Sequence, residues 1–81
     1  MSPEEQRKVA LRAIARTLAE VRRPKRHDLG EYGYAGGLIN MAAFLGLIDF
    51  DEAIRLAKLK TNAGDHAARE YRAQQEATHA A

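Results

Sequence analysis

Cysteine is absent from this chain of 81 residues, and Ser2 is its only serine. Without cysteine the chain cannot form a disulfide framework or bind a metal through thiolates. The longest apolar run, residues 38–48, is interrupted by Asn40 and is shorter than the roughly 20 residues that span a bilayer. The N-terminus is acidic and polar, whereas a secretory signal starts with basic residues. We therefore expect a cytoplasmic protein that does not cross a membrane.

Alternation of apolar and polar residues with a period of two, the mark of exposed strands, is also missing. Apolar residues instead recur at helical spacing, which predicts helices over residues 3–22, 34–45 and 49–61. A fourth, weaker helix is predicted over 65–77, because Tyr71 is its only large apolar residue. The predicted fold is an all-α bundle of three to four helices in a single domain, residues 1–81, with a core over 3–61.

Residues with well-defined capping roles mark the ends of these helices. Ser2 and Glu5 form a capping box before the first helix, and Asp49 and Glu52 form another before the third. Gly46 suits the left-handed position that ends the second helix. These residues predict a helical hairpin that turns at Gly46. The segment Asn62-Ala63-Gly64 is interpreted as the end of the third helix, with Asp65 as the cap of the fourth.

The apolar side of each helix should face the core. The second helix is apolar around most of its circumference, so we expect it to be the most buried. Its Gly36 and Gly37 lower helix propensity, which close approach by another helix would explain. The residues expected to point inward are Val9, Ala13, Ile14, Leu18 and Val21; Leu38, Ile39, Met41, Ala42, Phe44 and Leu45; and Phe50, Ala53, Ile54, Leu56 and Ala57.

The net charge of +2 conceals an uneven distribution. Residues 1–27 carry eight basic and three acidic side chains, a net of +5, and residues 28–81 carry five basic and eight acidic ones, a net of −3. Positive charge in the first third of the chain could neutralise phosphates. The candidate nucleic-acid contacts are Arg12, Arg16, Arg22, Arg23, Lys25 and Arg26.

Motifs for specific chemistry are weak or missing. The glycines of residues 30–37 lack the preceding strand of a dinucleotide fingerprint and the Gly-Lys-Ser/Thr of a P-loop, so a turn is the better interpretation. Ala42 and Gly46 match part of a helix-turn-helix, but its second helix would begin with acidic Asp51. The three histidines lack metal-ligand spacing. We expect no metal, no cofactor and no enzymatic activity.

Binding is then the expected function. Our first hypothesis is a small regulatory or adaptor protein that binds a protein surface, with a homodimer as one form. Exposed aromatic side chains are the expected contacts: Tyr32, Tyr34, Phe44, Phe50 and Tyr71. The alternative hypothesis is nucleic-acid binding through the basic first third of the chain. Absence of binding to duplex and single-stranded DNA at low salt would reject that alternative.

Overall fold

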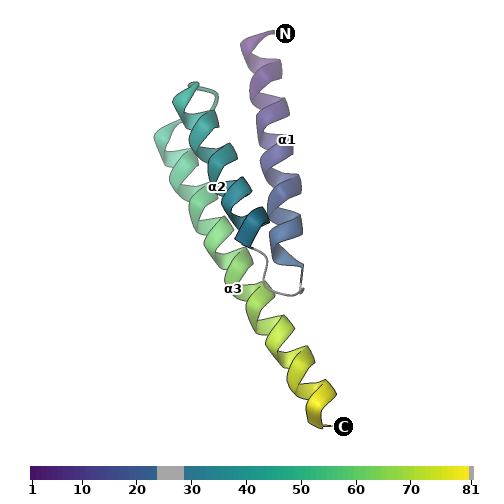
Figure 1. Ribbon diagram of the computed structural model, residues 1–81. Coiled ribbons are helices and arrows are strands. Elements are labelled where there is room, and N and C mark those ends of the chain that lie inside the picture. The colour runs from purple at the N-terminus through teal and green to yellow at the C-terminus, as the bar shows by residue number, and fades with distance from the viewer. Residues whose placement is uncertain (24–28, 81) are drawn as a thin grey trace.

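The computed structural model describes residues 1–23 and 29–80, and all regular structure in these two ranges is helical. Helix α1 covers Pro3–Arg22, α2 covers Leu29–Phe44 and α3 covers Phe50–Ala80. The three helices lie side by side, each in contact with the other two, and α3 continues well past the end of α1 (Figure 1). The predicted all-α bundle is confirmed.

Local capping chemistry sets three of the helix ends. The Ser2 side chain accepts a hydrogen bond from the Glu5 backbone N–H, at 3.2 Å. Asp49 and Glu52 each accept a hydrogen bond from the other's backbone N–H, at 2.8 and 3.1 Å, which completes the predicted capping box. Gly46 has a φ of +73°, and Leu47 donates to the Ala42 carbonyl at 2.9 Å. This pattern is a Schellman motif, so the hairpin turns at Gly46 as predicted.

The core lies near this hairpin. Its buried residues come from α1, α2 and the turn: Ile14, Ile39, Ala42 and Ile48. Partly buried side chains such as Leu18, Leu38 and Leu56 surround it. The buried side chains are few and mostly small, so each large one contributes a substantial share of the stability.

Two predicted boundaries are wrong. Helix α2 begins at Leu29, not at residue 34, and α3 runs unbroken through Gly64 to Ala80, so the third and fourth predicted helices are one. Tyr32 explains both differences. A Cβ on Gly64 would lie 3.2 Å from the Tyr32 ring, and the Lys60 ammonium lies 4.4 Å from the centre of that ring. This packing between α2 and α3 outweighs the low helix propensity of glycine.

Several residues predicted to face the core are exposed. On α1 this is Val9, which is 49% exposed. On α2 and α3 they are Met41, Phe44, Leu45, Phe50, Ile54 and Ala57. The reason is geometric: in a three-helix bundle each helix is covered on two sides only, so an evenly apolar helix such as α2 must leave one side in water.

The molecule is consequently elongated, with extents of 55 × 21 × 15 Å and a radius of gyration of 15.1 Å. A compact domain of this length has a radius of gyration of roughly 12 Å. The last turns of α3, from Arg72 to Thr78, are exposed. Within the described ranges no helix combines the length and the apolar character needed to cross a membrane.

Candidate protein-binding surface

The most exposed aromatic side chains lie at the hairpin end of the bundle. Phe44, in the last turn of α2, is 84% exposed, and Phe50, in the first turn of α3, is 78% exposed. Five residues and one tight turn separate them along the chain, so both side chains belong to the same end of the molecule. Both were predicted as partner contacts from the sequence.

Tyr34 extends this surface along α2. It is 63% exposed, and Met41, two turns further along the helix, is 56% exposed. Residues seven apart lie on one side of a helix, as do residues three apart, so Tyr34, Met41 and Phe44 share one side of α2. Gly37 falls on the same side and is exposed as well. This side of α2 is therefore apolar from its second turn to its end.

The neighbouring edge of α3 adds to the same surface. Phe50, Ile54, Ala57, Thr61 and Gly64 follow one another at intervals of three and four residues and so form one stripe. Gly64 touches Tyr32 of α2, which places this stripe on the α2 side of α3. None of its side chains is charged. We use the name α2 face for the exposed residues Gly33, Tyr34, Gly37, Asn40, Met41, Phe44, Phe50 and Ile54.

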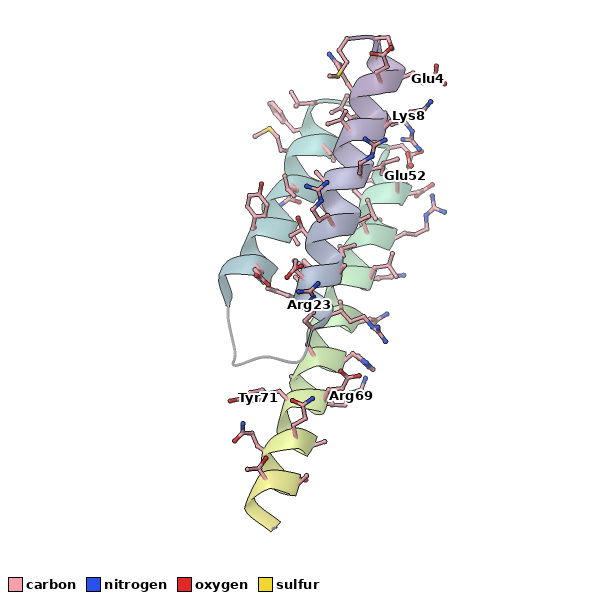
Figure 2. All side chains as sticks on the ribbon, turned by 90° about the vertical axis from the view of Figure 1, so that its right-hand side faces the viewer. Glu4, Lys8, Arg23, Glu52, Arg69 and Tyr71 are labelled. Atoms are coloured by element: carbon pink, nitrogen blue, oxygen red, sulfur yellow. The ribbon has the colours of Figure 1, made fainter. Side chains whose placement is uncertain are left out.

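The other two predicted contact tyrosines lie elsewhere. Tyr32 is half-buried between α2 and α3, where Lys60 and Gly64 contact its ring. Tyr71 is half-buried on α3 below the end of α1, on the side opposite Arg69 (Figure 2). The sequence argument missed Gly33, Gly37, Asn40, Met41 and Ile54 as members of the surface. The spacing Tyr34, Gly37, Met41 and Phe44 could have revealed it, because it is the 3,4 spacing of a helix-pairing seam.

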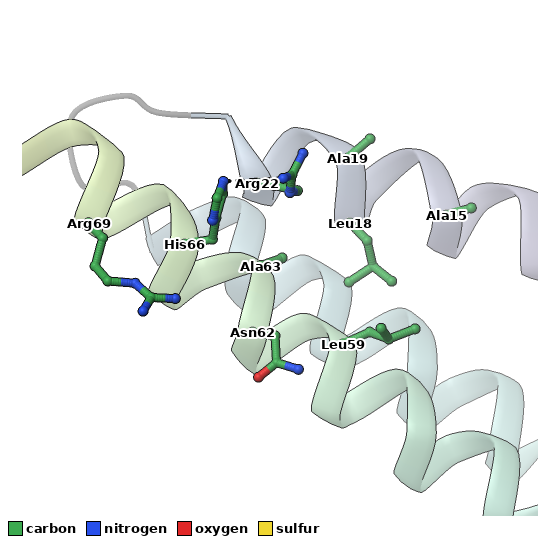
Figure 3. A pocket seen from close by; sticks show the side chains of 9 residues that line it. All are labelled: Ala15, Leu18, Ala19, Arg22, Leu59, Asn62, Ala63, His66 and Arg69. Atoms are coloured by element: carbon green, nitrogen blue, oxygen red, sulfur yellow. Dashed lines mark hydrogen bonds between the residues drawn. The ribbon is translucent and has the colours of Figure 1, made fainter. Parts of the chain in front are cut away.

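A second candidate site is an open groove of about 570 Å³ between α1 and α3 (Figure 3). The floor of the groove is apolar, and the end that Arg22, His66 and Arg69 form is basic. Helix α1 supplies Ala15, Leu18, Ala19 and Arg22, and α3 supplies Leu59, Asn62, Ala63, His66 and Arg69. None of the groove residues of α3 was predicted as a site residue, because only the packing of α1 against α3 brings them to Arg22.

His66 sits between two partners in this groove. Its Nε2 atom is 3.2 Å from the Arg22 guanidinium and is also paired with the Glu70 carboxylate. A ring nitrogen carries either a hydrogen or a lone pair, so Nε2 cannot accept from Arg22 and donate to Glu70 at once. When Nε2 is protonated it pairs with Glu70, and Arg22 loses its acceptor. The basic end of the groove therefore has two alternative hydrogen-bond arrangements.

The predicted nucleic-acid contacts are spread over α1. Arg12 and Arg16 are exposed on its outer side, together with Arg23, which pairs with Glu20 at 3.5 Å. Arg22 instead faces α3, at His66. Lys25 and Arg26 lie outside the described residues. Nothing in the structure tests binding to nucleic acid, so this alternative stays a prediction.

One ion pair fixes the hairpin end to α1. The Arg7 guanidinium donates to both carboxylate oxygens of Glu52, at 2.8 Å for one of them, and to the Leu47 carbonyl at 3.1 Å. The Arg7 hydrogen bonds, followed by the Asp49 backbone N–H, lower the pKa of Glu52 to about 2. The same carboxylate raises the pKa of Arg7. Arg7 thus holds the capping residue of α3 against α1.

This pairing predicts a loss of stability in acid. The folded pKa of Glu52 lies below the value of about 4.3 expected in an unfolded chain. Ionised Glu52 therefore stabilises the fold fully above pH ~4.3, and this contribution is lost as the pH falls toward 2. Urea unfolding should show wild type more stable than Glu52→Gln at pH 6, with the difference shrinking between pH ~4.3 and 2. Exposed Glu76→Gln is the control, and a Glu52→Gln difference independent of pH would contradict the prediction.

Neither a metal-binding cluster among the described residues nor a known relative adds to the description of this surface. Among residues 1–23 and 29–80, no three His, Cys, Asp or Glu side chains gather where they could hold a metal ion. No protein-family model, no curated protein and no solved structure matches the chain.

Proposed function

We propose that this protein acts by binding another polypeptide, without catalysing a reaction, and that the α2 face is its binding surface. The observation that carries the proposal is the exposure of α2. Glu31 is the only charged residue of this helix, yet Tyr34, Met41 and Phe44 are each more than half exposed. A helix that is apolar around most of its circumference is typically buried, so the exposed side of α2 is a surface that a partner would cover.

The residue types on the α2 face support a protein partner. Aromatic residues and methionine are enriched in the buried centres of protein interfaces, whereas lysine and aspartate are depleted. Transfer of one large apolar side chain from water to an interface contributes about 1.5–3 kcal/mol. Tyr34, Met41 and Phe44 share one side of α2 and Phe50 lies at the same end of the molecule as Phe44, and exposed apolar patches mark interaction sites.

The total surface area leads to the same proposal. A compact monomer of this size exposes roughly 4,900 Å². This chain exposes 6017 Å², an excess of roughly 1,100 Å² over that expectation. The free end of α3 accounts for part of the excess, and the α2 face for another part. A standard protein interface covers about 800 Å² on each partner, so the excess is of the size of one interface.

The absence of catalysis is also part of the proposal. General acid–base chemistry needs ionisable groups that converge in a cleft. The groove between α1 and α3 is open, and alanine and leucine side chains form most of its floor. At its end the Arg22 guanidinium lies 3.2 Å from the neutral acceptor nitrogen that the His66 ring can offer, so these two groups face each other. This geometry favours binding over a reaction.

The double substitution Phe44→Ser plus Phe50→Ser tests the proposal. Both side chains are exposed, so we expect the helical circular dichroism spectrum to be unchanged. Binding to polypeptides should fall at least tenfold, measured as self-association by sedimentation and as proteins recovered from native cell extract on the immobilised chain. The matched control is Val9→Ser, an exposed apolar position on α1 outside the α2 face. If the double variant and the control retain binding equally, the proposed surface is wrong.

A further inference from the structure

The exposed side of α2 has the spacing of a helix-pairing seam. Gly30, Tyr34, Gly37, Met41 and Phe44 follow one another at intervals of four, three, four and three residues. This is the spacing of the a and d positions through which two helices pack along their length. All five residues are uncharged, and the last four are exposed along the same side of the helix. A second helix can therefore lie along α2.

The glycines of α2 differ in what surrounds them. A Cβ on Gly36 would meet the Lys60 side chain at 3.1 Å, whereas a Cβ on Gly33 or Gly37 would meet no atom of the described residues within 4 Å. Glycine within a helix is about 0.5–1 kcal/mol less favourable than alanine. Packing inside this chain gives no reason for that cost at Gly33 and Gly37. Close approach of a helix from outside the chain would supply the reason.

The order of large and small residues identifies the helix that fits. Gly30 and Phe44 lie seven residues before and seven after Gly37, and Tyr34 and Met41 lie three before and four after. If a second α2 runs antiparallel with Gly37 at the crossing, each Phe44 lies opposite a glycine. Each Tyr34 then lies opposite a methionine. A parallel pair would instead place Phe44 against Phe44 and glycine against glycine.

We propose that the α2 face binds a second copy of this chain, with the two α2 helices antiparallel about a two-fold axis near Gly37. The inference rests on the proposed function, because it names the partner of the same surface. A two-fold interface brings identical patches together. The seam is uncharged, so no like charges meet across it. The surplus surface of the monomer, which includes the free end of α3, is of the size that one standard interface needs.

Cross-linking of cysteine variants tests the arrangement, since the natural chain has no cysteine. Tyr34→Cys and Met41→Cys each introduce a single thiol, and a disulfide forms only when the two Cα atoms lie about 4.4–6.8 Å apart. We expect covalent dimers when the two variants are mixed and oxidised, and at least fivefold fewer from either variant alone. Val9→Cys is the control for random collisions. Efficient cross-linking of each variant with itself would overturn the antiparallel arrangement.

Sedimentation of the natural chain separates this inference from the proposed function. A dimer dissociated by Phe44→Ser supports the inference. A natural chain that remains monomeric at several hundred micromolar overturns it. In that case proteins captured from native cell extract by the natural chain, and lost with Phe44→Ser plus Phe50→Ser, would still support polypeptide binding through the α2 face. If the natural chain neither dimerises nor captures proteins in a way that depends on Phe44 and Phe50, the proposed function is wrong as well.

Discussion

Ile14→Ala is expected to unfold a large part of the population at temperatures where the natural chain is folded. Ile14 is 1% exposed and packs in the core with Ile39, Ala42 and Ile48. Truncation of a buried isoleucine to alanine costs about 2–5 kcal/mol. A domain of this size has only roughly 3–5 kcal/mol available from a single small core. The substitution should therefore remove most of the stability.

Thermal unfolding followed by circular dichroism measures this effect. We expect the midpoint to fall by roughly 10 °C or more, since 1 kcal/mol corresponds to about 4–8 °C in a domain of this length. The matched control is Val9→Ala, also on α1 and also predicted from the sequence to face the core, but 49% exposed. Its cost should stay within about 0.5 kcal/mol. Equal losses for the two variants would show that the core does not lie where the structure places it.

Gly33→Ala plus Gly37→Ala is expected to stabilise the fold and to weaken self-association. Neither new Cβ would meet an atom of the described residues, so each substitution should raise helix stability by about 0.5–1 kcal/mol. The same methyl groups would stand between two α2 helices that cross at Gly37. The midpoint of thermal unfolding should therefore rise at dilute, monomeric concentrations, while the dimer dissociation constant should rise at least tenfold.

Gly36→Ala is the control for this pair. Its Cβ would meet the Lys60 ammonium at 3.1 Å, which itself lies over the Tyr32 ring. The substitution should therefore raise helix stability less than at Gly33 or Gly37, and it should leave self-association unchanged because Gly36 faces α3. If all three substitutions weaken association equally, α2 does not pair through the proposed seam. If Gly33→Ala and Gly37→Ala lower stability, their surroundings are not open.

Local signals in the sequence were sufficient for most helix ends. Ser2 before Pro3, the Asp49 and Glu52 capping box, and Gly46 each act through hydrogen bonds or backbone conformations that span only a few residues. Such signals depend little on the rest of the fold. The all-α class and the hairpin at Gly46 were therefore predicted from the sequence. Phe44 and Phe50 were candidate contacts as well, but the helical spacing also placed them toward the core, so their exposure did not follow from the sequence.

Gly64 shows where local signals fail. The sequence Asn-Ala-Gly followed by aspartate is typical of a helix end and a new cap, yet α3 continues through it. The deciding contact comes from Tyr32, on another helix, whose ring occupies the space that a side chain at position 64 would need. The same contact supports the early start of α2 among its glycines. No pattern within one helix contains that information.

The sequence alone thus determined that the chain is helical, where it turns at Gly46, and that it has more apolar surface than so short a chain can bury. Only the tertiary structure decided which apolar residues stay in water. Each helix of a three-helix bundle is covered by its two neighbours on two sides only, and its other side faces water. That geometry buries Ile14, exposes Val9 and Met41, and leaves one side of α2 in water. It also brings Arg7 to Glu52 and Arg22 to His66, pairs that lie far apart in the chain.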